Sequence, residues 1–160
     1  MGMSVTISAA DAQDAEHILK LQYLCYQSEA ELYGDYSIEP LTQSLDSLKA
    51  EIARGHALVA RLGDEVVASV RGEADETGTV GIARLIVHPR MRRHGLGGRL
   101  LDAIEAHFAL DPAPAAKRFR LFAGHLGDGS LRLYRSRGYE QVALREIGPR
   151  QTLVTLEKAA

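Results

Sequence analysis

The chain has 160 residues, enough for one compact domain with a buried core and too few for two ordinary ones. Hydrophobic residues make up 46% of it and charged residues 25%, a composition typical of soluble globular proteins. The formal net charge is −2, so no overall charge attracts the chain to nucleic acid or to an anionic membrane. We therefore expect a single domain over residues 1–160, with neither of these as a partner.

Cys25 is the only cysteine, which excludes an intramolecular disulfide and a thiolate-rich metal site. It lies in an apolar helical stretch, so we expect it to be a buried core residue. No two histidines have the i, i+4 spacing of a helical zinc site, and we expect no metal. The chain also lacks an apolar run of membrane-spanning length and a signal-like segment, which indicates a cytoplasmic location.

The first part of the chain predicts one strand and two helices. Residues 5–8 form a short strand, and Asp11 can cap a helix that continues to about Leu32. After a loop over residues 34–40, apolar residues recur at helical spacing from Leu41 to Ile52, which predicts a second helix ending at Gly55.

The second part predicts a sheet with two more helices. Strands are expected over 56–62 and 65–73, joined by a Gly-Asp turn, and over 79–88, 119–125, 139–145 and 152–157. Helices are expected over 97–110, where Pro112 and Pro114 end the pattern, and over 130–137; Gly148-Pro149 turns between the last strands. The order β-α-α-β-β-β-α-β-α-β-β indicates a mixed α/β (α+β) sheet with helices on its faces.

A basic, glycine-rich turn follows the strand that ends near Val87. Gly95 and Gly97 leave space for several backbone N–H groups to point at one anion, and the start of the next helix adds a partial positive charge. Arg92 and Arg93 add forked donors suited to phosphate oxygens. A Walker loop is excluded because Gly97 is followed by Gly-Arg, and a dinucleotide turn is excluded because Leu100 stands where a third glycine is needed.

This segment resembles the signature of the GNAT superfamily of acyl-CoA N-acyltransferases. Arg92, Gly95 and Gly97 behind Val87-His88-Pro89 match Arg/Gln-x-x-Gly-x-Gly/Ala after a strand ending in Val-x-Pro. Residues 130–139 look like the family's downstream Leu-Tyr-x-x-x-Gly-Phe/Tyr segment, and the element order is similar from Val5 to Lys158. The resemblance implies a mostly antiparallel sheet with splayed central strands and helices on both faces. The alternative is a surface arginine cluster at a helix start.

The resemblance also implies acetyl-CoA as co-substrate and direct attack by an amine, without an acyl-enzyme. The pantetheine arm would lie between the strand of Leu85 to Val87 and the strand over 119–125, and a backbone N–H near Leu85 or Ile86 would stabilise the oxyanion. Ser130 would either cap its helix, the interpretation we favour, or contact pantetheine. Arg132, Arg135 and Arg137 would form a solvated face, from which one could reach the 3′-phosphate. The cofactor-binding residues expected are Leu85, Ile86, Val87, Arg92, Arg93, His94, Gly95, Leu96, Gly97, Gly98 and Ser130.

Tyr134 matches the family's general acid, although an aromatic side chain packed on the sheet is the alternative. The family's usual glutamate base is replaced here by Gly81. Glu73 and His125, on neighbouring strands, are the substitutes that we consider, and His125 could equally be a buried imidazole. A base is needed because a lysine-like amine is mostly protonated at neutral pH.

The acceptor is least constrained by the sequence. The resemblance places the first two helices and their loop over the acceptor site, and their acidic and aromatic residues suit a small cationic amine. Exposed acids on a helix can also serve solubility alone, and a protein amine is a further alternative. A non-catalytic acyl-CoA-binding module is the competing function, and both a monomer and a homodimer remain open. The substrate residues expected are Tyr26, Glu29, Tyr33, Asp35 and Tyr36, with Glu39 beside them.

Overall fold

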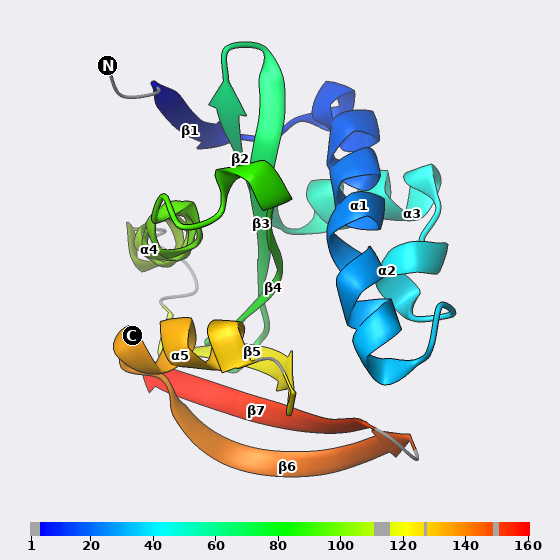
Figure 1. The fold of residues 1–160 in the computed structure, drawn as a ribbon. Coiled ribbons are helices and arrows are strands. Elements are labelled where there is room, and N and C mark those ends of the chain that lie inside the picture. Colours follow the sequence, from blue (N-terminus) through cyan, green and yellow to red (C-terminus); the bar gives the residue numbers. More distant parts are fainter. Residues whose placement is uncertain (1–3, 111–115, 127, 149–150) are drawn as a thin grey trace.

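The computed structural model describes residues 4–110, 116–126, 128–148 and 151–160. Its elements follow the predicted order, with an additional short helix and two 3₁₀ turns (Figure 1). The strands are β1 (Val5–Ala9), β2 (His56–Leu62), β3 (Glu65–Ala74), β4 (Thr79–Val87), β5 (Arg118–Gly124), β6 (Glu140–Gly148) and β7 (Gln151–Ala159). The helices are η1 (Ala12–Asp14), α1 (Ala15–Tyr33), α2 (Glu39–Thr42), α3 (Leu45–Arg54), η2 (Pro89–Met91), α4 (Leu96–Leu110) and α5 (Asp128–Ser136).

The strands form one seven-stranded sheet in the order β1-β2-β3-β4-β5-β7-β6. Every neighbouring pair is antiparallel except β4 and β5, which are parallel. A parallel pair cannot be joined by a tight hairpin, and here α4 makes the crossover. The predicted mixed, mostly antiparallel fold is confirmed.

Helices cover both faces of the sheet. In Figure 1, α4 lies on one side of the strands, and α1, α2 and α3 lie on the other. Leu100, Leu101 and Ile104 of α4 are buried in one core cluster, together with side chains of β2 to β5, α5 and β7. A second cluster joins Ile18 of α1 and Leu48 of α3 to the opposite face. Among the described residues, no helix is long and apolar enough to cross a membrane.

The second predicted helix is divided in two. Gln43 has an extended backbone and is buried, and the Ser44 side chain accepts a hydrogen bond from Ser47 N to begin α3. The sequence predicted one continuous helix here because the apolar residues keep helical spacing on both sides of the break. Asp11 caps as predicted, but it caps the short η1 turn, in a capping box with Asp14.

The capping interpretation of Ser130 is wrong. Helix α5 begins at Asp128, so Ser130 lies inside its first turn rather than before it. The strand limits expected near the chain's end were too short, because β6 and β7 extend to Gly148 and Ala159. The predicted break at Pro112 and Pro114 and the turn at Pro149 lie outside the described residues.

Candidate functional site

The two central strands separate along their length. Parallel pairing between β4 and β5 joins Thr79–Ile82 to Arg118–Leu121 and, within the described part of the sheet, goes no further. The last five residues of β4, 83–87, therefore have no β5 partner. Backbone groups that would complete a ladder are left facing the gap, where an extended ligand can use them. The predicted splay of the central strands is confirmed.

A bulge in β4 lies at the start of the gap. The register with β3 shifts between Ser69, which pairs with Ile86, and Arg71, which pairs with Ala83. Arg84 lies in this bulge with φ of 55°, a left-handed conformation that few residues other than glycine adopt. A bulge turns the residues that follow it, here Leu85 and Ile86. No pattern in the sequence indicated this feature.

The glycine-rich turn ends directly at a helix N-terminus. Arg93 and Gly95 have φ of 69° and 74°, and successive turns of this kind direct backbone N–H groups into one concavity. The first backbone bond of α4 runs from Arg99 N to Gly95 O at 3.1 Å, so the three N–H groups before it have no acceptor within the helix. Arg92, Arg93 and His94 are exposed around this turn, whereas the Leu96 side chain is buried and can contribute only its backbone.

Two glycines of the first turn of α4 face α5. A Cβ atom added to Gly97 would lie 3.3 Å from Leu133 Cδ2, and one added to Gly98 would overlap the Arg137 guanidinium. Arg137 also bonds Asp102, with 3.3 Å between Nε and Oδ1. Arg137 is therefore held against α4 rather than lying on the solvated face expected for it.

Tyr134 lies on α5 and is 7% exposed. Burial raises the pKa of Tyr134 to about 12, the nearby acidic groups of Tyr26 and Glu29 add to this, and Ser130 opposes it. The phenol is thus protonated at neutral pH, as a proton donor must be. Its ring centroid lies 6.2 Å from that of Tyr139, so the packing role foreseen for Tyr134 and a role as donor coexist.

The structure brings together some of the predicted acceptor residues. The Arg84 guanidinium carbon lies 6.0 Å from the centroid of the Tyr26 ring, and its Nη2 lies 3.5 Å from Glu39 Oε1. Burial raises the pKa of Glu29, and the charge of Arg84 partly offsets this. Tyr26, Glu29 and Glu39 therefore surround Arg84, close to Tyr134.

Of the other predicted acceptor residues, Tyr33 lies one turn after Glu29 on α1, whereas Asp35 and Tyr36 follow the end of that helix. Tyr33 spans from α1 to the end of β5, where its hydroxyl accepts a hydrogen bond from Leu126 N at 3.0 Å. Asp35 accepts hydrogen bonds from Ser37 N and Oγ in an exposed turn, and Tyr36 is exposed.

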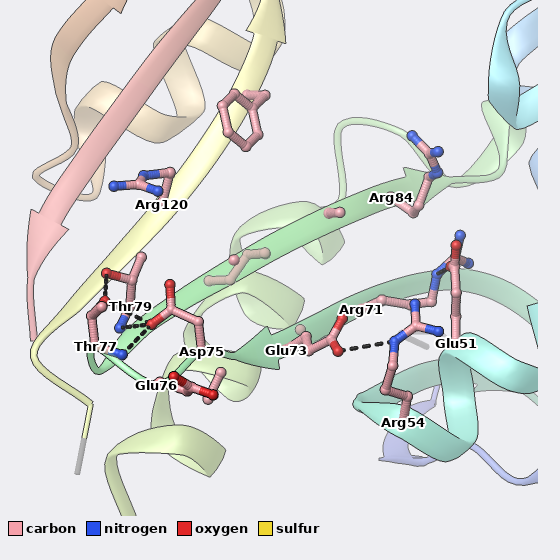
Figure 2. Close-up of a pocket in the computed structure, with 16 residues that line it drawn as sticks. Glu51, Arg54, Arg71, Glu73, Asp75, Glu76, Thr77, Thr79, Arg84 and Arg120 are labelled. Atoms are coloured by element: carbon pink, nitrogen blue, oxygen red, sulfur yellow. Dashed lines mark hydrogen bonds and ion pairs between the residues drawn. The ribbon is translucent and has the colours of Figure 1, made fainter. Parts of the chain in front are cut away.

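A cavity of about 1010 Å³ opens on the sheet face that α3 covers (Figure 2). Gly81 and Ala83 of β4 leave its floor without large side chains. Glu73 lies in its wall, directly opposite Gly81 in the register, and bonds Arg54 Nε at 2.9 Å. His125 is not among the residues that line this cavity; its Nδ1 accepts a hydrogen bond from Thr152 N at 3.0 Å. The structure thus favours Glu73 by position.

Sequence reasoning missed Arg71, which is buried beneath the same cavity. It forms an ion pair with Glu51 and donates to Gln22. The available signal was a charged residue directly after the mostly apolar segment Val66–Val70. The expectation for Cys25 is confirmed: it is buried, its Sγ lies 3.4 Å from Val87 O, and burial raises its pKa to about 11, with a small opposing effect from Arg92.

Comparison with known proteins gives the same fold around this site. The structure of paiA N-acetyltransferase from Thermoplasma acidophilum in complex with coenzyme A matches with a TM-score of 0.80 and 17% identity, over 99% of this chain and 100% of that one. The ribosomal-protein-S18-alanine N-acetyltransferase of Escherichia coli matches with a TM-score of 0.75 and 14% identity, over 98% and 94% of the two chains.

The splayed strands and the N–H-lined turn thus define the fold of an acetyltransferase. The profile of the acetyltransferase (GNAT) family matches residues 16–139, and the chain belongs to that family. Mycothiol acetyltransferase of Saccharopolyspora erythraea is 29% identical over 133 residues, which cover 79% of this chain but only 41% of that protein. The predicted enzyme class, a GNAT-type acyltransferase, is confirmed.

Proposed function

We propose that the protein is an N-acetyltransferase that moves an acetyl group to a primary amine by direct attack within a ternary complex. The observation that carries this proposal is the gap between β4 and β5 beyond Ile82, together with the helix N-terminus of α4. A thioester co-substrate with a phosphate-bearing tail needs both an extended slot and an anion site.

The residues present fit coenzyme A. The N–H groups of Leu96, Gly97 and Gly98, with Arg92 and Arg93, would hold the pyrophosphate, and His94 and Gly95 complete the turn. Residues 85–87 would hold the pantetheine amides along the edge of β4. Acetyl-CoA supplies an activated acetyl group as its thioester. Ser130 would act on Tyr134 rather than on the coenzyme, because it lies one turn before Tyr134 on α5 and lowers the pKa of that hydroxyl.

Tyr134 would hold the proton that the leaving sulfur needs. Its pKa of about 12, raised mainly by burial, keeps the hydroxyl protonated over the physiological range. A backbone N–H at Leu85 or Ile86, turned by the bulge, would face the carbonyl oxygen as negative charge develops. One such donor is typically worth about 3 kcal/mol.

Glu73 would take the proton from the incoming ammonium group, directly or through one water molecule. Gly81 leaves room on β4, and the register sets Glu73 beside that room. His125 remains the alternative base, although its Nδ1 is already bonded to β7. The prediction of a small cationic acceptor draws support from Tyr26, Glu29 and Glu39 around Arg84, and a protein amine would also have to reach this cavity.

A coenzyme-release assay with a panel of amines tests the proposed function. Wild-type protein should release free coenzyme A from acetyl-CoA in an amine-dependent manner, and Glu73→Gln should slow this by about 10²-fold or more at neutral pH. The loss should be smaller at high pH, where more of the amine is already neutral. No amine-dependent release by the wild type would contradict the proposal.

A further inference from the structure

A polar network is buried under one end of the cavity, where β3 meets the bulge of β4. Arg71 is 6% exposed, its Nε lies 3.0 Å from Glu51 Oε2, and its Nη2 donates to Gln22 Oε1 at 3.0 Å. Gln22 in turn donates to Pro40 O and to Gln43 Oε1, both at 2.9 Å. These contacts join α1, α2 and α3 to β3 and fix the position of the guanidinium.

One end of that guanidinium lacks an acceptor. Arg71 Nη1 is buried and has no hydrogen-bond partner among the protein atoms that the structure describes. Leaving such a donor unpaired costs about 1–3 kcal/mol, and unpaired groups of this kind are rare in folded proteins. Arg71 also belongs to the cavity wall, and Figure 2 shows it beside Glu51 at the end that Arg84 lines. A ligand oxygen at this end would complete the network.

The charges around the cavity have both signs. Burial lowers the pKa of Arg71, Glu51 opposes this, and the like charge of nearby Arg84 lowers it further. An anionic group between the two arginines would relieve their repulsion. Acidic walls alone would select a cation, whereas this lining suits a molecule that carries both charges. The charged residues that line the cavity are Arg54, Arg71, Arg84 and Arg120, and Glu51, Glu73, Asp75 and Glu76.

The position of Arg71 relates this anion site to the reacting group. Arg71 pairs with Ala83, and Leu85, expected to face the acetyl carbonyl, follows two residues later across the bulge at Arg84, at most about 7 Å along the strand. Since an arginine side chain and a small ligand together span that distance, the anion and the amine can belong to one small molecule. We propose that the acceptor is an amine of the amino-acid type, with its carboxylate held by Arg71 and Arg84 and its amine directed toward Leu85.

This inference rests on the proposed function and narrows its acceptor from any cationic amine to one that also carries a carboxylate. Matched probes test it: a set of free amino acids, the amide of each, and the amine left when the carboxyl group is removed. At fixed acetyl-CoA, kcat/KM should be about 10- to 100-fold higher for an amino acid than for its amide, the effect of one charge-assisted contact. Arg71→Lys should lower kcat/KM for the acid and leave that for the amide nearly unchanged.

Arg61→Gln is the control, because Arg61 also forms a partly buried ion pair, with Asp14 at 2.8 Å, but does not line the cavity. It should retain the preference for the acid. If Arg71→Lys does not fold, the wild type still provides a test: an N-acetyl amino acid, the product, should raise its melting temperature more than the corresponding amide does.

Equal rates and equal melting shifts for acids and amides, or a preference for the decarboxylated amines, would overturn the inference and leave the acetyltransferase function intact. Acetyl-CoA binding without transfer to any amine would overturn both.

Discussion

Removal of the Tyr134 hydroxyl separates its two roles in the structure. Tyr134→Phe keeps the ring in the core, where it lies 6.2 Å from the ring of Tyr139, and removes only the hydroxyl, which lies near Ser130. Losing the hydroxyl should lower the free energy of unfolding by no more than about 1 kcal/mol, the value of one hydrogen bond. Losing a positioned proton donor should lower kcat by about 10²-fold or more, with little change in the affinity for acetyl-CoA.

Tyr139→Phe is the matched control. Tyr139 is equally buried, but its hydroxyl donates to Glu105 Oε2 at 2.8 Å, away from the proposed reaction. A hydrogen bond to a charged group contributes about 1.5–3 kcal/mol, so this variant should lose stability and keep its kcat. Single-turnover rates and urea unfolding of both variants distinguish the two effects. Equal single-turnover rates for wild type and Tyr134→Phe would refute the donor role.

Because burial raises the pKa of Tyr134 to about 12, Tyr134 should not titrate between pH 8 and 10. Any fall in kcat over that pH range should therefore be the same in wild type and in Tyr134→Phe, which pH–rate profiles check. Acetyl-CoA at a hundred times Kd should stabilise the wild type by about 2.7 kcal/mol in a melting assay. Gly97→Glu should abolish that gain and Gly97→Ala, which brings the same Cβ within 3.3 Å of Leu133, should only weaken it; equal effects would argue against an anion site. Asp14→Asn should destabilise by about 1 kcal/mol at pH 7. Burial opposes ionisation of Asp14, but hydrogen bonds from Asp11 and Arg61 outweigh it and lower the pKa below 3.8, so the difference from wild type should shrink below about pH 4 in urea titrations. A difference that persists at pH 2 would contradict this.

The parts of the fold that the sequence predicted are those specified by neighbouring residues. The Gly63-Asp64 hairpin forms, with Gly63 at φ of 64°, because a two-residue turn needs that conformation. The apolar face of α4 was predicted in the same way from the spacing of its apolar residues, and the turn before it from its glycines. The break at Gln43 was missed because its cause is distant: Gln22, 21 residues earlier, binds its side chain.

The candidate site follows the same division. Its phosphate-binding turn is a local motif and could be predicted, whereas its acceptor cavity is assembled from α3, β3, β4 and β5. The bulge at Arg84 depends on how β3 and β4 pair, and the buried position of Arg71 depends on helices that pack over it. In a single sequence, the only signal of such a network is a charged residue that follows an apolar strand segment.

The choice of base illustrates what register adds to a sequence. Gly81 and Glu73 are eight residues apart in the chain, and only the pairing of β3 with β4 makes them neighbours. Opposite residues of antiparallel strands lie about 5 Å apart. The Glu73 carboxylate can therefore reach the space that a side chain at position 81 would have occupied. That space is open, because the nearest atom to a Cβ added at Gly81 is Glu73 O at 3.9 Å. A slip of one residue would turn Glu73 to the opposite face, under α4. The two candidate bases were therefore equivalent in the sequence, and their different surroundings arise from strand pairing rather than from residue type.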